Sequence, residues 1–332
     1  MVKFLVVRFS SIGDIILTTP VLRHLKQQVE EAEIHYLTKS AFVPLLENNP
    51  HVDRIHSYSG NLNQTADTLK ALGFDYIIDL HHNARTERLK LKLKRMDFSV
   101  NKLNFKKWLY VNLHIDRLPD RHMVDRNLDT IRNFISERDH QGLDYFLPES
   151  DTVDLQTLPR SFQNGYIAMA IGAQHETKRL PLELLLRLCT TLKHPLVMLG
   201  DRHDKATADA IVKALPDKQI LNQCGVLNIH QSASLVQQSR LLITHDTGLM
   251  HVGAAFKKKI ISIWGNTVPG FGMYPYRADP ASVQFGVDGL RCRPCSKIGY
   301  QRCPRKHFKC MAEQDISAIS QAAERLFRVT GQ

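Results

Sequence analysis

Short apolar runs alternate with amphipathic segments along almost the whole chain. Runs of this length are typical of buried strands, and in a parallel sheet a crossover helix follows each strand. In the N-terminal half, strands are expected at residues 3–9, 33–38, 54–58 and 75–80, with a weaker one at 98–101. Helices are expected in a segment ending near residue 28 and at residues 42–48, 65–72, 86–94 and 124–137. This alternation predicts an α/β unit.

A segment rich in turn formers, residues 148–164, separates this half from a second region with the same rhythm. There, strands are expected at residues 166–171, 196–199, 219–222, 241–244 and 259–264. Helices are expected at residues 182–192, 205–215 and 229–238, and from residue 247 onward. The pattern predicts two doubly wound domains, residues 1–155 and 156–315. Residues 316–332 contain an amphipathic helix that could pack back on the N-terminal domain.

The composition is that of a globular protein with an anionic partner. Hydrophobic residues make up 43% of the chain and charged residues 23%, and the net charge is +11. No run approaches the ~18 apolar residues of a membrane span, and the N-terminal apolar run is too short for a signal peptide. A cytoplasmic protein is therefore expected. Nucleic-acid binding would suit the charge, but the sequence has no helix-turn-helix signature or aromatic RNA-binding platform.

Positive charge is concentrated between residues 85 and 107. Nine lysines and arginines, Arg85 and Arg88 among them, stand there against only Glu87 and Asp97. Such a run is either a solvated face or a surface that meets phosphates or an anionic leaflet.

The first candidate site follows the first expected strand. Ser10, Ser11 and Gly13 form a tight turn with free backbone N–H groups, and Asp14 lies near the start of the next helix. Ligands of open α/β sheets bind at such loops. Asp14 is therefore either a helix-capping carboxylate or a catalytic one. A dinucleotide fingerprint would need three glycines, and this loop has one.

The second candidate follows the first strand of the second region. Lys178 and Arg179 stand just before a helix that Pro181 opens. Two cations near a helix N-terminus would suit a pyrophosphate, although such a pair alone is more often a surface feature.

The third and fourth candidates also follow strands. Asp246 ends a buried strand, and Thr247 and Gly248 open a short helix whose free N–H groups can hold an anion. His251, one turn further, is either a core histidine or a ligand-binding one. The fourth is the loop with Asn266 and Thr267, which is either an ordinary turn or a polar contact for a phosphate or sugar.

The ordered set of motifs closely resembles glycosyltransferase family 9, the ADP-heptose:lipopolysaccharide heptosyltransferases. The resemblance extends from about residue 2 to residue 316 and rests on five segments in a fixed order. These are Arg8-Phe9-Ser10-Ser11-Ile12-Gly13-Asp14, Thr18-Thr19-Pro20, Thr177-Lys178-Arg179, Asp246-Thr247-Gly248-Leu249-Met250-His251 and Trp264-Gly265-Asn266-Thr267.

The resemblance implies a GT-B fold, in which two Rossmann-like domains face each other across a cleft. It also implies an inverting, metal-independent transfer with no cofactor, in which Asp14 is the general base. On the acceptor side it places Ser10, Ser11, Gly13, Arg85 and Arg88. The implied donor and phosphate-binding residues are Thr177, Lys178, Asp246, Thr247, Gly248 and His251, with Asn266 and Thr267 in a nearby loop.

The implied partners are ADP-heptose and an anionic, lipid-linked glycan such as a lipopolysaccharide core, without nucleic acid. Peripheral contact with the inner face of the inner membrane is then expected. The loop Trp264-Gly265-Asn266-Thr267 departs from the Tyr-Gly-Pro/Ala-Thr/Ser type of the best-known members. Another nucleotide sugar therefore stays open as the donor, and so does an epimerase with the same fold. A non-catalytic nucleic-acid binder is the remaining alternative.

Four cysteines lie within 19 residues near the C-terminus, at Cys292, Cys295, Cys303 and Cys310. One interpretation is a structural zinc site, although only one true Cys-x2-Cys pair is present. The other is a loop with free thiols, and disulfides are disfavoured in a cytoplasmic protein.

Overall fold

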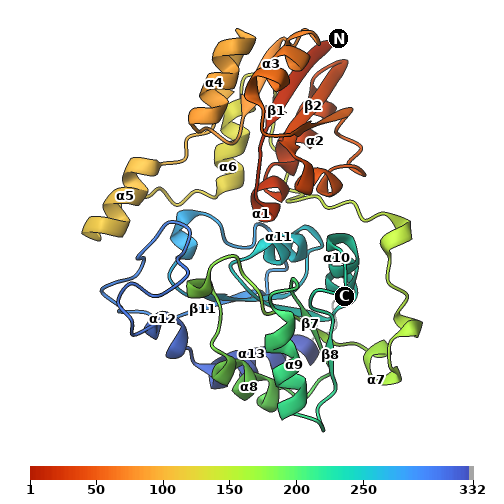
Figure 1. Cartoon of the computed structure of the whole chain (residues 1–332), viewed down its shortest axis with the longest axis vertical. Coiled ribbons are helices and arrows are strands. Elements are labelled where there is room, and N and C mark those ends of the chain that lie inside the picture. Colours follow the sequence, from red (N-terminus) through yellow and green to blue (C-terminus); the bar gives the residue numbers. More distant parts are fainter. Residues whose placement is uncertain (329–332) are drawn as a thin grey trace. The chain divides into compact units, whose positions relative to one another are not determined.

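The structure, a computed structural model, describes residues 1–328, which form two compact units (Figure 1). The first unit consists of Met1–Asn104 and Asp120–Phe146. The second consists of Phe105–Pro119 and the chain from Leu147 onward. The chain thus leaves the first unit for fifteen residues and then returns to it. The division after residue 146 precedes the boundary expected at residue 155.

The first unit is built on a five-stranded parallel sheet with the order β3-β2-β1-β4-β5. Its strands are β1 (Val2–Val7), β2 (Ala32–Lys39), β3 (Arg54–Tyr58), β4 (Tyr76–Asp79) and β5 (Met96–Ser99). Its helices are α1 (Ile12–Ile16), α2 (Thr19–Gln28), α3 (Leu62–Lys70), α4 (Ala84–Leu93) and α6 (Met123–Leu128), with 3-10 turns η1 (Ser40–Leu45) and η2 (Asp129–Ile131). Each expected strand is present.

The core of the first unit follows from the apolar runs that predicted its strands. Leu5 and Val7 of β1 pack with Leu37 of β2 and Ile77 of β4, and all four side chains are buried. Buried strands leave their last residues at one edge of a parallel sheet. The loops after β1 and β4 therefore emerge side by side, because these two strands pair in register.

The second unit is built on a six-stranded parallel sheet with the order β11-β10-β9-β6-β7-β8. Its strands are β6 (Ile167–Ala170), β7 (Leu196–Leu199), β8 (Ile220–Asn222), β9 (Leu241–His245), β10 (Ile260–Trp264) and β11 (Val283–Gly286). Its helices are α5 (Asn104–Leu113, from its second residue), α7 (Arg160–Gln163), α8 (Leu182–Thr191), α9 (Lys205–Ala214), α10 (Ile229–Gln238), α11 (Gly248–Ala255), α12 (Lys309–Ala312) and α13 (Ile316–Arg328). Short 3-10 turns are η3 (Glu149–Asp151), η4 (Leu155–Thr157), η5 (Glu176–Lys178) and η6 (Pro269–Phe271).

The C-terminal helix belongs to the core of the second unit. Ile316, Ile319, Ala323 and Leu326 of α13 are buried in the same apolar cluster as β6, β7, β9 and α8. This placement differs from the expected packing on the N-terminal domain. The amphipathic spacing correctly located a buried face, but spacing alone does not say which sheet covers it. The last four residues of the expected element, 329–332, lie outside the described residues.

Several elements differ from the expected ones. The helix expected at residues 42–48 is the 3-10 turn η1, which contains Pro44, and a proline removes the N–H that an α-helix needs. The helix expected at residues 124–137 ends at Leu128, followed by η2, and Phe134 joins an aromatic cluster with Phe4 and Phe98. Helix α5 and strand β11 were not expected. No helix among residues 1–328 is long and apolar enough to cross a bilayer.

Candidate active site

The Asp14 turn connects β1 to α1 at the carboxyl edge of the first sheet. Ser11 precedes α1, and Asp14 is the third residue of that helix. The Ser11 backbone N–H donates to Asp14 Oδ2 over 3.2 Å, and the Ser11 hydroxyl donates to the same oxygen over 2.9 Å. Gly13 is buried beside them. Asp14 therefore does cap its helix, and its other carboxylate oxygen is left for a different partner.

That partner is Arg8, the first residue after β1. Its Nη2 atom lies 2.7 Å from Asp14 Oδ1, and the guanidinium is held in place by donating to the carbonyls of Ser10 and Leu80. Burial raises the pKa of Asp14, but the Arg8 charge and the hydrogen bonds from Ser11 outweigh it and lower the pKa to about 2. Because of this low pKa, Asp14 is ionised at neutral pH. Its side chain is a quarter exposed, so a ligand can still contact it.

His81 is a residue of this edge that the sequence reasoning missed. It follows β4, and its ring packs edge-on against Phe9 with centroids 5.2 Å apart. Burial, followed by the charges of Arg8 and Lys102, lowers the pKa of His81 to about 3. The fully buried Asp79 at the end of β4 accepts the His81 backbone N–H. An Asp-Leu-His-His run ending a strand was the signal that could have identified it.

Arg85 and Arg88 line a pocket at the N-terminus of α4. The pocket has a volume of about 520 Å³ and also includes Tyr58 and Asn83. The Arg85 guanidinium lies 5.3 Å from the centre of the Tyr58 ring and 5.5 Å from that of Phe9. Asn83 caps α4 by accepting from its first N–H groups. Two arginines at a helix N-terminus make this pocket suited to an anionic group.

The basic run of residues 85–107 is thus divided by the fold. Arg85 and Arg88 line the pocket, whereas Lys90 pairs with Asp97 at 2.8 Å and with Glu87 at 2.9 Å. Lys107 belongs to the second unit, where its Nζ lies over the Phe271 ring.

In the second unit, three of the expected donor-side residues are in direct contact. Lys178 Nζ lies 2.6 Å from Asp246 Oδ2, and the Thr267 hydroxyl donates to the same oxygen over 2.9 Å. These residues come from the loops after β6, β9 and β10, which are neighbours in the sheet. Parallel pairing therefore brings together three motifs that lie up to 89 positions apart in the sequence.

Thr247 and Gly248 open α11 beside this cluster, as the sequence predicted. Both residues are partly exposed, and the Thr247 side chain makes no hydrogen bond to the N–H groups at the start of the helix. His251 is buried in the same helix. Gly253 packs so closely on the sheet that a Cβ there would lie 2.5 Å from the Leu242 side chain. The small residues thus seat the helix with its N-terminal N–H groups beside Asp246.

Asn266 is 1% exposed, and neither polar atom of its carboxamide has a hydrogen-bond partner within residues 1–328. Buried polar groups are nearly always hydrogen-bonded, so this unpaired carboxamide next to the Lys178–Asp246 cluster makes Asn266 a candidate contact for a ligand. The residue before Asn266 is a glycine because the backbone there passes close to Thr177. A Cβ on Gly265 would lie 2.5 Å from the Thr177 carbonyl oxygen.

Thr177 and Arg179 hold the turn around Lys178. The Thr177 hydroxyl donates to the Tyr300 carbonyl over 3.0 Å and accepts from the Tyr300 N–H over 2.8 Å. Arg179 pairs with Asp204 at 3.0 Å and donates to the Ala173 carbonyl. His245 accepts the Leu180 N–H over 3.1 Å. The Thr177 and Arg179 side chains thus fix the turn from which Lys178 reaches Asp246.

The cysteine-bearing segment wraps the same motifs. Arg293 donates to the carbonyls of Gly265 and Thr267, over 2.8 and 3.3 Å, and Gln314 donates to the Trp264 carbonyl over 3.0 Å. Cys292, Cys295, Cys303 and Cys310 are free thiols. Among residues 1–328, no group of three or more His, Cys, Asp or Glu side chains is arranged to hold a metal ion. The zinc interpretation stays a prediction, and the segment supports the loop of Asn266 through the contacts of Arg293 and Gln314.

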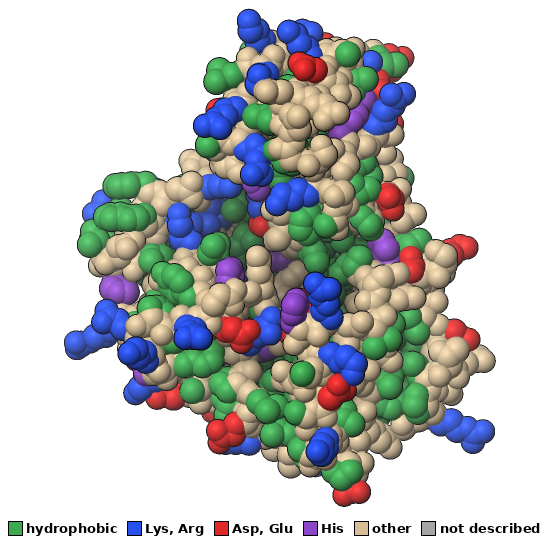
Figure 2. Space-filling model, in the orientation of Figure 1, with side chains coloured by type: hydrophobic (Ala, Val, Ile, Leu, Met, Phe, Trp, Pro, Cys, Tyr) green, Lys and Arg blue, Asp and Glu red, His purple; other side chains and the backbone are tan. Residues whose placement is uncertain are grey.

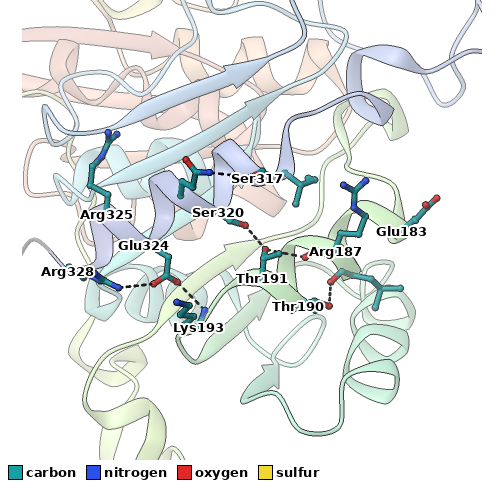
Figure 3. A pocket seen from close by; sticks show the side chains of 13 residues that line it. Glu183, Arg187, Thr190, Thr191, Lys193, Ser317, Ser320, Glu324, Arg325 and Arg328 are labelled. Atoms are coloured by element: carbon teal, nitrogen blue, oxygen red, sulfur yellow. Dashed lines mark hydrogen bonds and ion pairs between the residues drawn. The ribbon is translucent and has the colours of Figure 1, made fainter.

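A larger cavity lies between α8 and α13 (Figure 3). Its volume is about 1120 Å³, and it is lined by Arg187, Arg325 and Arg328 but also by Glu183 and Glu324. The motif residues described above are absent from its lining. It is a groove between two packed helices, separate from the strand-end cluster.

Comparison with known proteins agrees with this arrangement. The family model for glycosyltransferase family 9 (heptosyltransferase) matches residues 63–302. The chain is 24% identical to lipopolysaccharide heptosyltransferase 1 of Pseudomonas aeruginosa, over 95% of this chain and 93% of that protein.

Two solved structures share the fold. The family 9 glycosyltransferase of Veillonella parvula superposes with a TM-score of 0.78 at 22% identity, covering 99% of this chain and 98% of that one. The ADP-heptose lipopolysaccharide heptosyltransferase II of Escherichia coli gives 0.72 at 18% identity, covering 98% of each. Two parallel α/β units of this kind confirm the predicted GT-B fold. The chain therefore belongs to glycosyltransferase family 9, the heptosyltransferase family, and is a glycosyltransferase.

Proposed function

We propose that this protein transfers heptose from ADP-heptose to an anionic, lipid-linked glycan of the lipopolysaccharide-core type, with inversion and without a metal ion. The observation that carries the proposal is the ionised, partly exposed Asp14 at the strand-end turn of the first unit. The relatives named above suggest the donor and the acceptor class, because one is a lipopolysaccharide heptosyltransferase and another is an ADP-heptose lipopolysaccharide heptosyltransferase.

In this mechanism Asp14 is the general base. The acceptor hydroxyl oxygen forms a bond to the anomeric carbon as the bond from that carbon to the β-phosphate oxygen breaks. The acceptor proton passes to Asp14, and ADP leaves with the electron pair of the broken bond. A carboxylate of low pKa is a weak base toward a free alcohol. The proton therefore moves late, after the developing positive charge on the sugar has made the attacking hydroxyl acidic.

The leaving diphosphate needs positive charge and N–H donors already in place. Lys178 supplies the charge, and the first turn of α11 supplies the N–H groups. Asp246 orients Lys178 from 2.6 Å, and Thr267 shares the same carboxylate oxygen. Because these groups are held by one another, little reorganisation is needed as the diphosphate charge grows.

The acceptor contributes an anionic group to the first unit. The pocket of Arg85 and Arg88 offers two guanidinium groups at a helix N-terminus, which suits a phosphate or a sugar carboxylate. We place the protein in the cytoplasm, in peripheral contact with the inner face of the inner membrane, because its acceptor is lipid-linked.

A different nucleotide sugar is the second candidate for the donor. The observation that favours this alternative is Asn266. Its unpaired carboxamide lies in the loop whose sequence departs from that of the best-known family members. A thermal-shift panel of nucleotide sugars separates the two, because a bound ligand raises the melting temperature by mass action. ADP-heptose is expected to give the largest shift. A larger shift with another nucleotide sugar would contradict ADP-heptose as the donor.

Transfer itself is tested with ADP-heptose and a lipopolysaccharide-core acceptor, by product mass and anomeric configuration. Retention of configuration would contradict Asp14 as a general base in a direct displacement. Loss of transfer after exhaustive chelation would contradict metal independence.

A further inference from the structure

Helix α5 presents an apolar, partly aromatic face to solvent. Phe105 is 71% exposed, Trp108 49% and Leu113 53%, and Ile115 just after the helix is 43% exposed. Phe105 and Trp108 lie one helical turn apart, and their rings stack with centroids 6.4 Å apart. Large side chains of this kind normally avoid water, and a contiguous exposed set of them marks an interaction surface.

The opposite face of α5 is attached to the second unit. The Tyr110 ring meets the Phe271 ring edge-on at 6.1 Å, and Lys107 Nζ lies 5.5 Å from the centre of the same ring. Lys107 is buried, whereas its neighbour Lys106 is exposed. Phe105 and Trp108 are thus held outward by a packed helix.

The charges within helix α5 are all positive, and the first carboxylate after it, Asp116, follows Ile115 directly. Between Asp97 and Asp116 the sequence contains no acidic residue, and the exposed Lys106 directly follows Phe105. Figure 2 shows hydrophobic side chains gathered over α5 at the left, with basic side chains beside them. Aromatic and aliphatic residues interleaved with lysine are the composition of helices that lie in a membrane interface.

We propose that the face formed by Phe105, Trp108, Leu113 and Ile115, with Lys106, docks this protein on a bilayer containing anionic lipid. The apolar side chains enter the headgroup region, and Lys106 meets the lipid phosphates. This membrane-docking proposal rests on the proposed function only in that a lipid-linked acceptor gives a reason for contact with a bilayer. It identifies α5 as the membrane-binding element, which neither the basic run of residues 85–107 nor the family relationship did.

The chain is well suited to an optical test because it has two tryptophans, Trp108 and the buried Trp264. The full chain is mixed with vesicles of phosphatidylcholine alone or with added phosphatidylglycerol, and binding is measured by co-sedimentation. Anionic vesicles are expected to bind the protein and to shift its emission to shorter wavelengths. Trp108→Phe should bind within about twofold of the wild type and lose that spectral change, since phenylalanine keeps most of the apolar surface.

The affinity of the double variant Phe105→Ser with Trp108→Ser for anionic vesicles is expected to fall at least about tenfold. Two large apolar side chains that the bilayer would bury are then missing. Leu182→Ser, which changes an exposed leucine of α8 in the same unit, is the matched control and should bind like the wild type. The melting temperature of each variant checks that it is folded. Equal binding by the double variant and the wild type would overturn the proposal, and so would an unchanged Trp108 emission on bound vesicles.

A competing occupant is a second copy of the chain. A wild-type dimer in solution that the double variant dissociates would assign the face to self-association and overturn the membrane proposal. Transfer is measured separately with a water-soluble, deacylated acceptor, on which the double variant should match the wild type. Vesicle binding without any heptose transfer would leave the surface standing and reject the proposed function.

Discussion

Arg8 Nη2 lies 2.7 Å from Asp14 Oδ1, and this contact sets the protonation state of the proposed base. Two carbonyls hold the guanidinium, so its position does not depend on a ligand. The same contact that keeps Asp14 ionised also weakens it as a base. Arg8 is therefore a positioning residue whose removal should alter the pH dependence of transfer as well as its rate.

Replacing Arg8 tests this relationship. The wild-type pKa of Asp14, about 2, lies below its ordinary value of 3.8, so the carboxylate stays ionised until the pH falls through about 2. In Arg8→Met the burial of Asp14 is no longer opposed by the guanidinium, and its pKa should rise. The acidic limb of the kcat/KM profile should then move to higher pH, and Arg8→Lys should move it back. An acidic limb in the same place for all three proteins would show that Arg8 does not control Asp14.

Removing the carboxylate should abolish catalysis without disturbing the donor. Asp14→Asn keeps the size of the side chain, and transfer is expected to fall on the order of 100-fold or more. The donor-induced rise in melting temperature should stay close to that of the wild type, because the proposed donor-binding groups lie in the second unit. Asp53→Asn, at a surface carboxylate that pairs with Lys26, is the matched control. Wild-type turnover by Asp14→Asn would reject the mechanism.

Lys178 and Asp246 should act on the donor as one group. Lys178→Met is expected to raise the KM for the donor on the order of tenfold, since one charge-assisted phosphate contact is lost. Asp246→Asn should raise it as well, because Lys178 loses its orienting partner. In the double variant the two losses should be less than additive by about 1 kcal/mol. Simple additivity would indicate two independent contacts, and Lys205→Met, at an exposed ion pair, controls for charge alone.

The arginine pocket should affect the acceptor and leave the donor unchanged. Arg85→Leu and Arg88→Leu are each expected to raise the KM for the acceptor roughly tenfold and to weaken its dependence on salt, because fewer charges are then screened. Arg95→Leu, an exposed arginine just beyond α4, should change neither constant. A changed donor KM with an unchanged acceptor KM would assign the pocket to the other substrate.

Asn266 should show opposite effects on stability and on binding. An unpaired buried carboxamide costs stability, so Asn266→Leu should leave the melting temperature of the free protein unchanged or higher. The rise in melting temperature on adding the donor should become smaller, because the amide no longer contacts it. If the variant instead melts lower without ligand and keeps the full donor-induced rise, the carboxamide serves the fold.

The sequence by itself determined the two parallel sheets and the position of each motif after a strand. Apolar runs must be buried, and a polar residue directly after such a run must lie at the carboxyl edge of a parallel sheet. Asp246 and Asn266 could be located in this way because each follows its strand within two residues, and Asp14 and Lys178 because each lies in the segment that leads from a strand to the next helix. The amphipathic spacing of α13 likewise revealed a buried face.

Only the tertiary structure decided which partners those residues have. The contacts of Asp246 with Lys178 and Thr267 depend on strand order, which no local pattern encodes. The path of the chain after β11 likewise made Thr177 an anchor for the segment around Tyr300. Helix α5 shows the same limit, because the sequence showed its lysines as part of a basic run. Packing alone buried Lys107 against Phe271 and left Phe105 and Trp108 facing water.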